Sequence, residues 1–326
     1  MLPDAIVTLS PPPEPIAYLD GVFLHLSQAK VSIFDLGLVQ GAGVTEMVRT
    51  FAGIPFRLDE HLDRLFRSMH AVGFRIPQAR DELAALVHKI VAHNFRLVPA
   101  THDLGIVLFV TPGLNRTYVG AAGMPAESPP TVCIHTFPLP FELWAGKIDA
   151  GQRLVIPSIR HVPAECIDPR IKMRSRMHWY LADREARGVD PQAQALLLDH
   201  AGAITETSTA NFFIVTNGEI RTPGGDVALG GVSQCVVCEL AVRDGVPFRP
   251  ATLHPDDAFA ADEAFTSSTP YCLLPVTRLD GREIGGGRPG PIFARMMAAW
   301  NELAGLDIIE QLRQGAADRI AATAGK

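Results

Sequence analysis

Apolar side chains recur along the chain with the periods of both helices and strands. Residues 59–73 place Leu62, Leu65 and Met69 on one helical face, and Asp59 is a suitable N-cap for this stretch. Similar patterns predict helices over residues 59–73, 80–94, 174–188, 232–244 and 291–304.

Shorter runs that alternate or are rich in β-branched residues predict strands between these helices. The predicted strands are residues 31–34, 104–111, 131–137, 153–157, 195–199, 203–205, 212–215 and 264–267. The pairs Asp20-Gly21 and Ala52-Gly53 mark hairpin turns ahead of the first helix. The mixture of elements predicts an α+β protein.

The segment 138–147 interrupts the regular pattern and divides the chain into two predicted domains. Pro138 and Pro140 are incompatible with a helix interior or a central strand, so we expect a connection here. The predicted parts are an N-terminal extension (1–16), a small α/β domain (17–137), an interdomain loop (138–147), a large domain (148–310) and a C-terminal tail (311–326).

The composition is that of a globular protein with enough chain for two cores. Of its 326 residues, 47% are hydrophobic and 20% are charged, with a formal net charge of −6. A negative chain binds nucleic-acid phosphates poorly. No run of about 18 apolar residues exists, and the first twenty residues lack a basic signal-peptide start. We therefore expect a soluble, cytoplasmic protein without nucleic-acid or membrane partners.

The cysteines predict neither a disulfide framework nor a metal site. There are five, an odd number, in a chain of this length. Cys235 and Cys238 have metal-ligand spacing, but no second Cys or His pair lies near them in the sequence. We expect buried thiols in an apolar helix and no bound metal.

Lys172 and Glu206 are the residues with the most specific chemistry. A lysine amine can condense with an aldehyde, and a carboxylate beside a pyridine nitrogen keeps that nitrogen protonated. Either residue alone is most often a solvated surface side chain. Their pairing as the two ends of one electron sink is what the family resemblance given below implies.

Three more segments carry residues suited to an anion. Periodicity places Arg64 on the polar side of its predicted helix, yet a buried phosphate needs the fixed charge and bidentate contacts that Arg offers. Gly230 and Gly231 precede the apolar helix 232–244, a composition typical of an anion site at a helix N-terminus. The third segment is residues 265–269, rich in Ser and Thr.

These segments, in this order, resemble the class IV (fold-type IV) aminotransferases that use pyridoxal 5′-phosphate (PLP), both branched-chain and D-amino-acid types. The resemblance runs from about Ala17 to Trp300. It implies a small α/β sandwich domain, a larger barrel-like PLP-binding domain and a homodimer whose sites lie between the domains. It also implies a transaminase that moves an amino group between an amino acid, or a primary amine, and a 2-keto acid by a ping-pong mechanism.

The resemblance also implies a role for each matching residue. Lys172 would bind the cofactor covalently and transfer protons during catalysis. Glu206 would face the ring nitrogen, and Leu229 would pack on the ring. The phosphate would be held by Arg64, Val232, Ser233 and Thr269.

The substrate-binding segments match no subfamily cleanly. Gln40 and Thr45 stand where branched-chain enzymes have aromatic residues. Arg49 matches an arginine of those enzymes, whereas Gly105 stands at the position of a second one. Pro270, after Thr269, has no N–H to offer a substrate carboxylate. The substrate-binding candidates are Arg49, Arg116, Gln40, Thr45 and Pro270.

Two other functions stay open at the level of sequence. The segment 116–118 faintly resembles one in lyases of the aminodeoxychorismate type, which share the PLP residues. A non-catalytic PLP-binding scaffold is the second, although such a protein would have no physical need for both Lys172 and Glu206.

Overall fold

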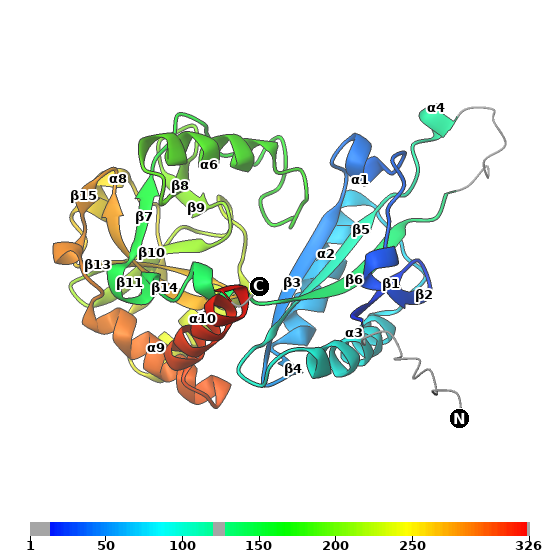
Figure 1. The fold of residues 1–326 in the computed structure, drawn as a ribbon. Coiled ribbons are helices and arrows are strands. Elements are labelled where there is room, and N and C mark those ends of the chain that lie inside the picture. Colours follow the sequence, from blue (N-terminus) through cyan, green and yellow to red (C-terminus); the bar gives the residue numbers. More distant parts are fainter. Residues whose placement is uncertain (1–13, 120–127, 325–326) are drawn as a thin grey trace, which may run out of the picture.

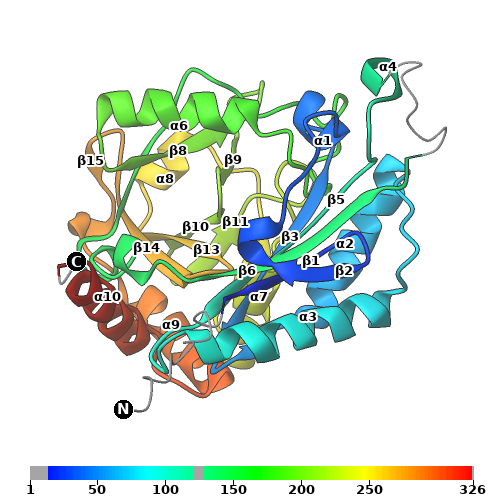
Figure 2. The same cartoon turned by 45° about the vertical axis from the view of Figure 1, so that its right-hand side comes forward.

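The computed structural model describes residues 14–119 and 128–324, which form two sheets (Figure 1). The smaller sheet has six antiparallel strands in the order β2-β1-β6-β5-β3-β4. Its strands are β1 (Ile16–Leu19), β2 (Val22–His25), β3 (Val44–Phe51), β4 (Ile54–Pro55), β5 (Leu104–Thr111) and β6 (Thr131–Pro138). Two helices, α2 (Leu58–Val72) and α3 (Arg80–Asn94), cover one face of this sheet (Figure 2).

The two faces of β3 serve different purposes. Val44 and Val48 point into a core with α2 and α3, where Leu62 and Leu65 are fully buried. Phe51 belongs instead to the core of the larger sheet. Because successive side chains of a strand point to opposite faces, β3 contributes to the cores of both sheets and so joins the two halves of the molecule.

The larger sheet has nine strands and curls back on itself. β9 pairs with both β8 and β10, which closes the path β10-β13-β14-β7-β8-β9 into a barrel-like sheet. The strands are β7 (Gln152–Val155), β8 (Ala193–Leu198), β9 (Ile204–Thr207), β10 (Asn211–Thr216), β11 (Glu219–Thr222), β12 (Phe248–Pro250), β13 (Glu263–Ser268), β14 (Cys272–Leu279) and β15 (Arg282–Glu283). The predicted fold class, a small α/β domain beside a barrel-like domain, is confirmed.

Helices complete the larger half. They are α5 (Lys147–Ala150), α6 (Met177–Val189), α7 (Val232–Arg243), α8 (Pro255–Phe259), α9 (Pro291–Ala304) and α10 (Ile308–Ala324). The short helices α1 (Leu36–Val39) and α4 (Arg116–Val119) belong to the smaller half, and the 3-10 turns are η1 (Leu26–Gln28), η2 (Phe95–Leu97), η3 (Phe141–Leu143) and η4 (Gly285–Gly287). None of the helices described is long and apolar enough to cross a membrane.

Three expectations from the sequence are wrong. Residues 31–34 form no strand, because the side chains of Ser32 and Asp35 accept hydrogen bonds from nearby backbone N–H groups and stabilise turns. Cys235 is exposed and Cys238 half-buried, because α7 buries its other face. The end of the chain is no peripheral tail: α10 packs on η3, and Leu312 is fully buried. Most of the predicted N-terminal extension lies outside the described residues.

Candidate active site

One pocket brings together residues that are far apart in the sequence. All seven predicted cofactor-binding residues line it: Arg64, Lys172, Glu206, Leu229, Val232, Ser233 and Thr269. We call this cavity the Lys172 pocket. Its walls come from α2, the segment before α6, β9, the N-terminus of α7 and the turn after β13.

Backbone contacts to the smaller sheet hold Lys172 in place. The N–H of Thr45 donates to the Lys172 carbonyl at 2.9 Å, and the N–H of Lys172 donates to Ser68 Oγ at 3.2 Å. Burial, reinforced by the positive charge of Arg64, lowers the pKa of Lys172 to about 8. A substantial fraction of this lysine is therefore a neutral, nucleophilic amine near neutral pH.

Arg64 is buried, not solvated as its periodicity suggested. Its Nε and Nη2 atoms donate to the two carboxylate oxygens of Glu46 at 2.7 and 2.8 Å, and its Nη1 donates to the Gly230 carbonyl at 2.9 Å. Burial would raise the pKa of Glu46, but Arg64 and His61 outweigh it and lower the value to about 2. Glu46 thus stays ionised and fixes the guanidinium at the edge of the pocket.

The start of α7 forms a cradle for an anion. The N–H groups of Val232 and Ser233 belong to the first turn and have no partner inside the helix. A Cβ atom on Gly231 would lie 2.0 Å from Asn211 Oδ1, so only glycine fits there. The Asn211 amide in turn donates to the Leu229 carbonyl at 2.7 Å and fixes the loop.

Two contacts hold Glu206 in place. The Leu229 N–H donates to its Oε1 at 3.3 Å, and Nε2 of His161 lies 3.6 Å from the same oxygen. Because Nδ1 of His161 donates to the Val162 carbonyl, Nε2 is the ring nitrogen that faces Glu206. Burial opposes a charge on His161, but the contact with Glu206 outweighs it and raises the pKa of His161.

The structure does not bring the substrate-binding candidates into the pocket as a group. Gln40 and Arg116 are exposed, and the Thr45 hydroxyl donates to the Leu108 carbonyl within the smaller sheet. The Pro270 carbonyl accepts a hydrogen bond from Arg49 at 3.1 Å.

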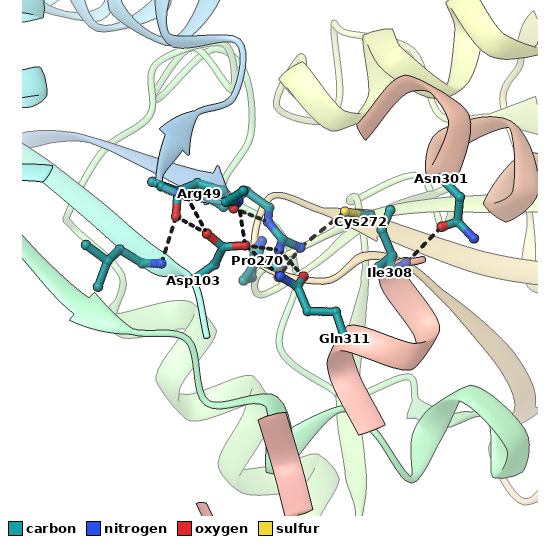
Figure 3. A network of polar contacts seen from close by, with 11 residues as sticks. Arg49, Asp103, Pro270, Cys272, Asn301, Ile308 and Gln311 are labelled. Carbon is teal, nitrogen blue, oxygen red and sulfur yellow. Dashed lines mark hydrogen bonds and ion pairs between the residues drawn. The ribbon is translucent and has the colours of Figure 1, made fainter. Parts of the chain in front are cut away.

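Arg49 lies in a separate buried group, which we call the Arg49 cluster and define as Arg49, Asp103 and Gln311 (Figure 3). Its Nε donates to the Thr50 carbonyl and its Nη2 to Gln311, while Asp103 lies 3.7 Å away. Every guanidinium nitrogen of Arg49 is therefore occupied by protein. Unlike Arg64, Arg49 also lies outside the lining of the Lys172 pocket, which favours a structural role rather than a contact with substrate.

Several residues of the site were not predicted from the sequence, among them Arg176, His161 and Ser267. Arg176 lines the pocket just before α6, and His161 supports Glu206. Ser267 also lines the pocket, and its buried hydroxyl has no hydrogen-bond partner within residues 14–119 and 128–324. Its place in the Ser- and Thr-rich segment 265–269 was the one available signal.

Comparison with known proteins connects this geometry to a family. The family described as "Amino-transferase class IV" matches residues 43–279. The chain belongs to the class IV aminotransferases. Family membership confirms the predicted PLP-dependent transamination, since class IV aminotransferases use PLP.

Individual relatives of this class IV aminotransferase cover nearly the whole chain. A "Putative branched-chain-amino-acid aminotransferase" of Methanocaldococcus jannaschii is 33% identical over 294 residues, which are 88% of this chain and 95% of the relative. A D-alanine aminotransferase of Bacillus licheniformis is 28% identical over 282 residues, covering 86% and 94%. The crystal structure of a branched-chain amino acid aminotransferase from T.th. with pyridoxamine 5′-phosphate has a TM-score of 0.78 at 26% identity, covering 90% and 95%.

The residues of the Lys172 pocket fit PLP. The Ser267 hydroxyl and the N–H groups at the start of α7, which have no hydrogen-bond partner in the described part of the chain, provide donors for phosphate oxygens. Lys172 provides an amine for the cofactor aldehyde, and Glu206 provides a carboxylate for a protonated ring nitrogen.

Proposed function

We propose that this class IV aminotransferase performs its reaction in the Lys172 pocket, with Lys172 as the catalytic residue. The observation that carries the proposal is that Lys172, Glu206, Arg64 and Ser233 line one cavity although they come from different parts of both halves. An amino donor and a 2-keto acid acceptor would use this cavity in turn, in a ping-pong cycle.

Each residue has a distinct task in this proposal. When bound, PLP supplies an aldehyde carbon that accepts the amino group and a ring that withdraws electrons. Lys172 would hold that carbon, and its neutral Nζ would move the proton at the α-carbon of the donor. Glu206 keeps the ring nitrogen protonated, and Arg64 and Ser233 hold the phosphate against the start of α7.

The surroundings offer a substrate α-carboxylate few partners. A Cβ on Gly105 would lie 2.4 Å from the Phe137 ring and 3.0 Å from Met47, so no arginine fits at this position. Arg49 has no free nitrogen, and Pro270 has no N–H. We therefore propose that the donors include primary amines without an α-carboxylate, or amino acids, D-amino acids among them, that Arg116 binds.

A homodimer is part of the proposal. Leu38 and Met177 are large apolar side chains with exposures of 67% and 69%. They lie in neighbouring segments, because the Ser175 hydroxyl donates to the Gly41 carbonyl. A second copy that covers them would bury apolar surface beside the pocket. The cytoplasmic location stays a prediction.

A donor panel tests the proposed activity. L-branched-chain amino acids, D-alanine and chiral primary amines are each offered with one common 2-keto acid, and both products are measured. We expect transamination that Lys172→Ala abolishes, with primary amines or D-amino acids among the good donors. Activity confined to L-branched-chain amino acids, and unchanged in Arg116→Ala, would contradict the proposed selectivity. Repeated turnover of aminodeoxychorismate to pyruvate without a keto acid acceptor would indicate the lyase instead.

A further inference from the structure

Arg176 is a cation of the Lys172 pocket without an acidic partner among the described residues. It is the N-cap residue of α6, is half-buried, and its guanidinium lies 5.7 Å from the centre of the Trp179 ring. One Nη2 N–H donates to the Ser208 carbonyl, and no other hydrogen bond or ion pair of this side chain occurs within the described part of the chain. Most of its five donors are thus available to a ligand.

The pocket carries an excess of positive charge that a bound anion would neutralise. Arg64 is paired with Glu46 through two hydrogen bonds, so its charge is largely balanced by protein. Protonated Lys172 and Arg176 share the pocket with the single carboxylate of Glu206. Arg176 also contributes to lowering the pKa of Lys172, as expected for two cations that face the same space.

Arg64 and Arg176 lie at different walls. Arg64 contacts Gly230, next to the phosphate cradle of α7, whereas Arg176 contacts Ser208 and Trp179, beyond Glu206 on β9. In PLP the phosphate arm and the ring oxygen are attached on opposite sides of the aldehyde carbon. If the phosphate were held at α7, the aldehyde carbon at Lys172 and the ring nitrogen at Glu206, the ring oxygen would point away from α7, toward the part of the pocket that Arg176 lines.

We propose that Arg176 is the cationic partner of the ring oxygen of PLP and holds that oxygen in its anionic form. This inference rests on the proposed use of the Lys172 pocket. It assigns Arg176 to the cofactor rather than to the substrate, and it explains why a guanidinium with one backbone acceptor lies beside the catalytic lysine.

The test is a pH titration of the visible absorbance of PLP-loaded protein in the absence of substrate. Removing a positive charge beside the ring oxygen makes protonation of the bound cofactor easier, so Arg176→Met should raise the titration midpoint by about one pH unit or more. Arg176→Lys keeps the charge and should shift the midpoint far less. Arg174→Met is the matched control: Arg174 is exposed, lies two residues away and does not line the pocket.

The outcomes separate this inference from the proposed function. An unchanged midpoint in Arg176→Met, with a raised KM for amino acids but not for primary amines, would assign Arg176 to the substrate carboxylate and overturn the inference. If the parent protein acquires no visible absorbance with PLP, the proposed function itself fails. Should Arg176→Met not fold, Arg176→Gln, which retains a donor for Ser208, replaces it in the same titration.

Discussion

Arg49 and Arg176 are two arginines in the interior of the same chain, and they differ in what their donors meet. Arg49 is 1% exposed, and each of its nitrogens contacts protein. Arg176 is half-buried, donates to one carbonyl and lines a cavity. The contrast shows that donors facing open space, more than burial itself, mark a cation available for binding.

The two regions also differ in what they connect. The Arg49 cluster links β3, the loop before β5, the turn at Pro270 and α10, with Asp103 accepting hydrogen bonds from Thr50 and Gln311 (Figure 3). The Lys172 pocket instead leaves a buried hydroxyl at Ser267 without a partner among the described residues. Substitutions in the cluster should therefore change stability, and substitutions in the pocket should change chemistry.

The largest effect is expected at Lys172. Lys172→Ala removes both the amine that binds the cofactor and the base, so the half-reaction with an amino donor should slow by about 10²–10⁴-fold or more. Stopped-flow absorbance measures the rate, and urea unfolding should show little loss of stability. Lys147→Ala, at a half-buried lysine outside the pocket, is the control. A similar loss in both variants would mean that the pocket is not where the reaction occurs.

At Arg49 the expected loss is in stability. Arg49→Met leaves Asp103 buried without its cation, which should lower the free energy of unfolding by about 3–5 kcal/mol. Adding Asp103→Asn should recover part of that loss, as a double-mutant cycle in urea would show. Arg80→Met, which removes an arginine paired with Asp59 and Asp63 on the surface, should cost far less. Equal costs at both positions would refute the structural role of the cluster.

Arg64 should govern retention of the cofactor. Arg64→Met removes a charge-assisted contact to phosphate and should weaken PLP binding by about 1.5–3 kcal/mol. Dialysis against PLP-free buffer measures this. The control is Arg67→Met, an exposed arginine on the same helix. If the Arg64 and Arg67 variants retain PLP equally, Arg64 serves only to neutralise Glu46.

The smallest expected effect is a shift in pH dependence. Because burial and Arg64 lower the pKa of Lys172 to about 8, capture of pyridoxal by the apo protein should rise with pH around a midpoint near 8. Pyridoxal has no phosphate, so Arg64→Met does not remove a contact to this ligand. Loss of the positive charge of Arg64 should raise the pKa of Lys172 and move the midpoint upward. A midpoint near the ordinary lysine value in the parent protein would show that Lys172 is fully solvated.

Hydrophobic periodicity alone predicted the elements whose buried and exposed residues alternate with the period of a helix or a strand. The predicted ranges for α3, β5 and α9 agree with the structure residue for residue. Periodicity was insufficient for elements whose burial depends on packing against a segment far away in the sequence. α10 is rich in alanine, its Gly315 lies against Phe141, and its Leu312 is buried in the core of the larger half. β14 carries Pro275, which hid a central strand in the sequence.

The same distinction holds for the candidate site. Residues within recognisable segments, such as Glu206 and Ser233, line the pocket as predicted. Arg49 matches a family arginine and so is a substrate-binding candidate in the sequence, but no sequence pattern shows that Asp103 and Gln311 converge on it. Arg176 falls inside the helix predicted over residues 174–188, but α6 begins one residue later, at Met177, so helical periodicity could not assign Arg176 a face.

Borohydride reduction of PLP-loaded protein, followed by peptide mapping, tests the central claim most directly. Reduction fixes the cofactor to the lysine that holds it. We expect a single modified peptide that contains Lys172, and no modification of Lys147 or Lys89. A cofactor adduct on any lysine other than Lys172 would contradict the assignment of this pocket as the active site.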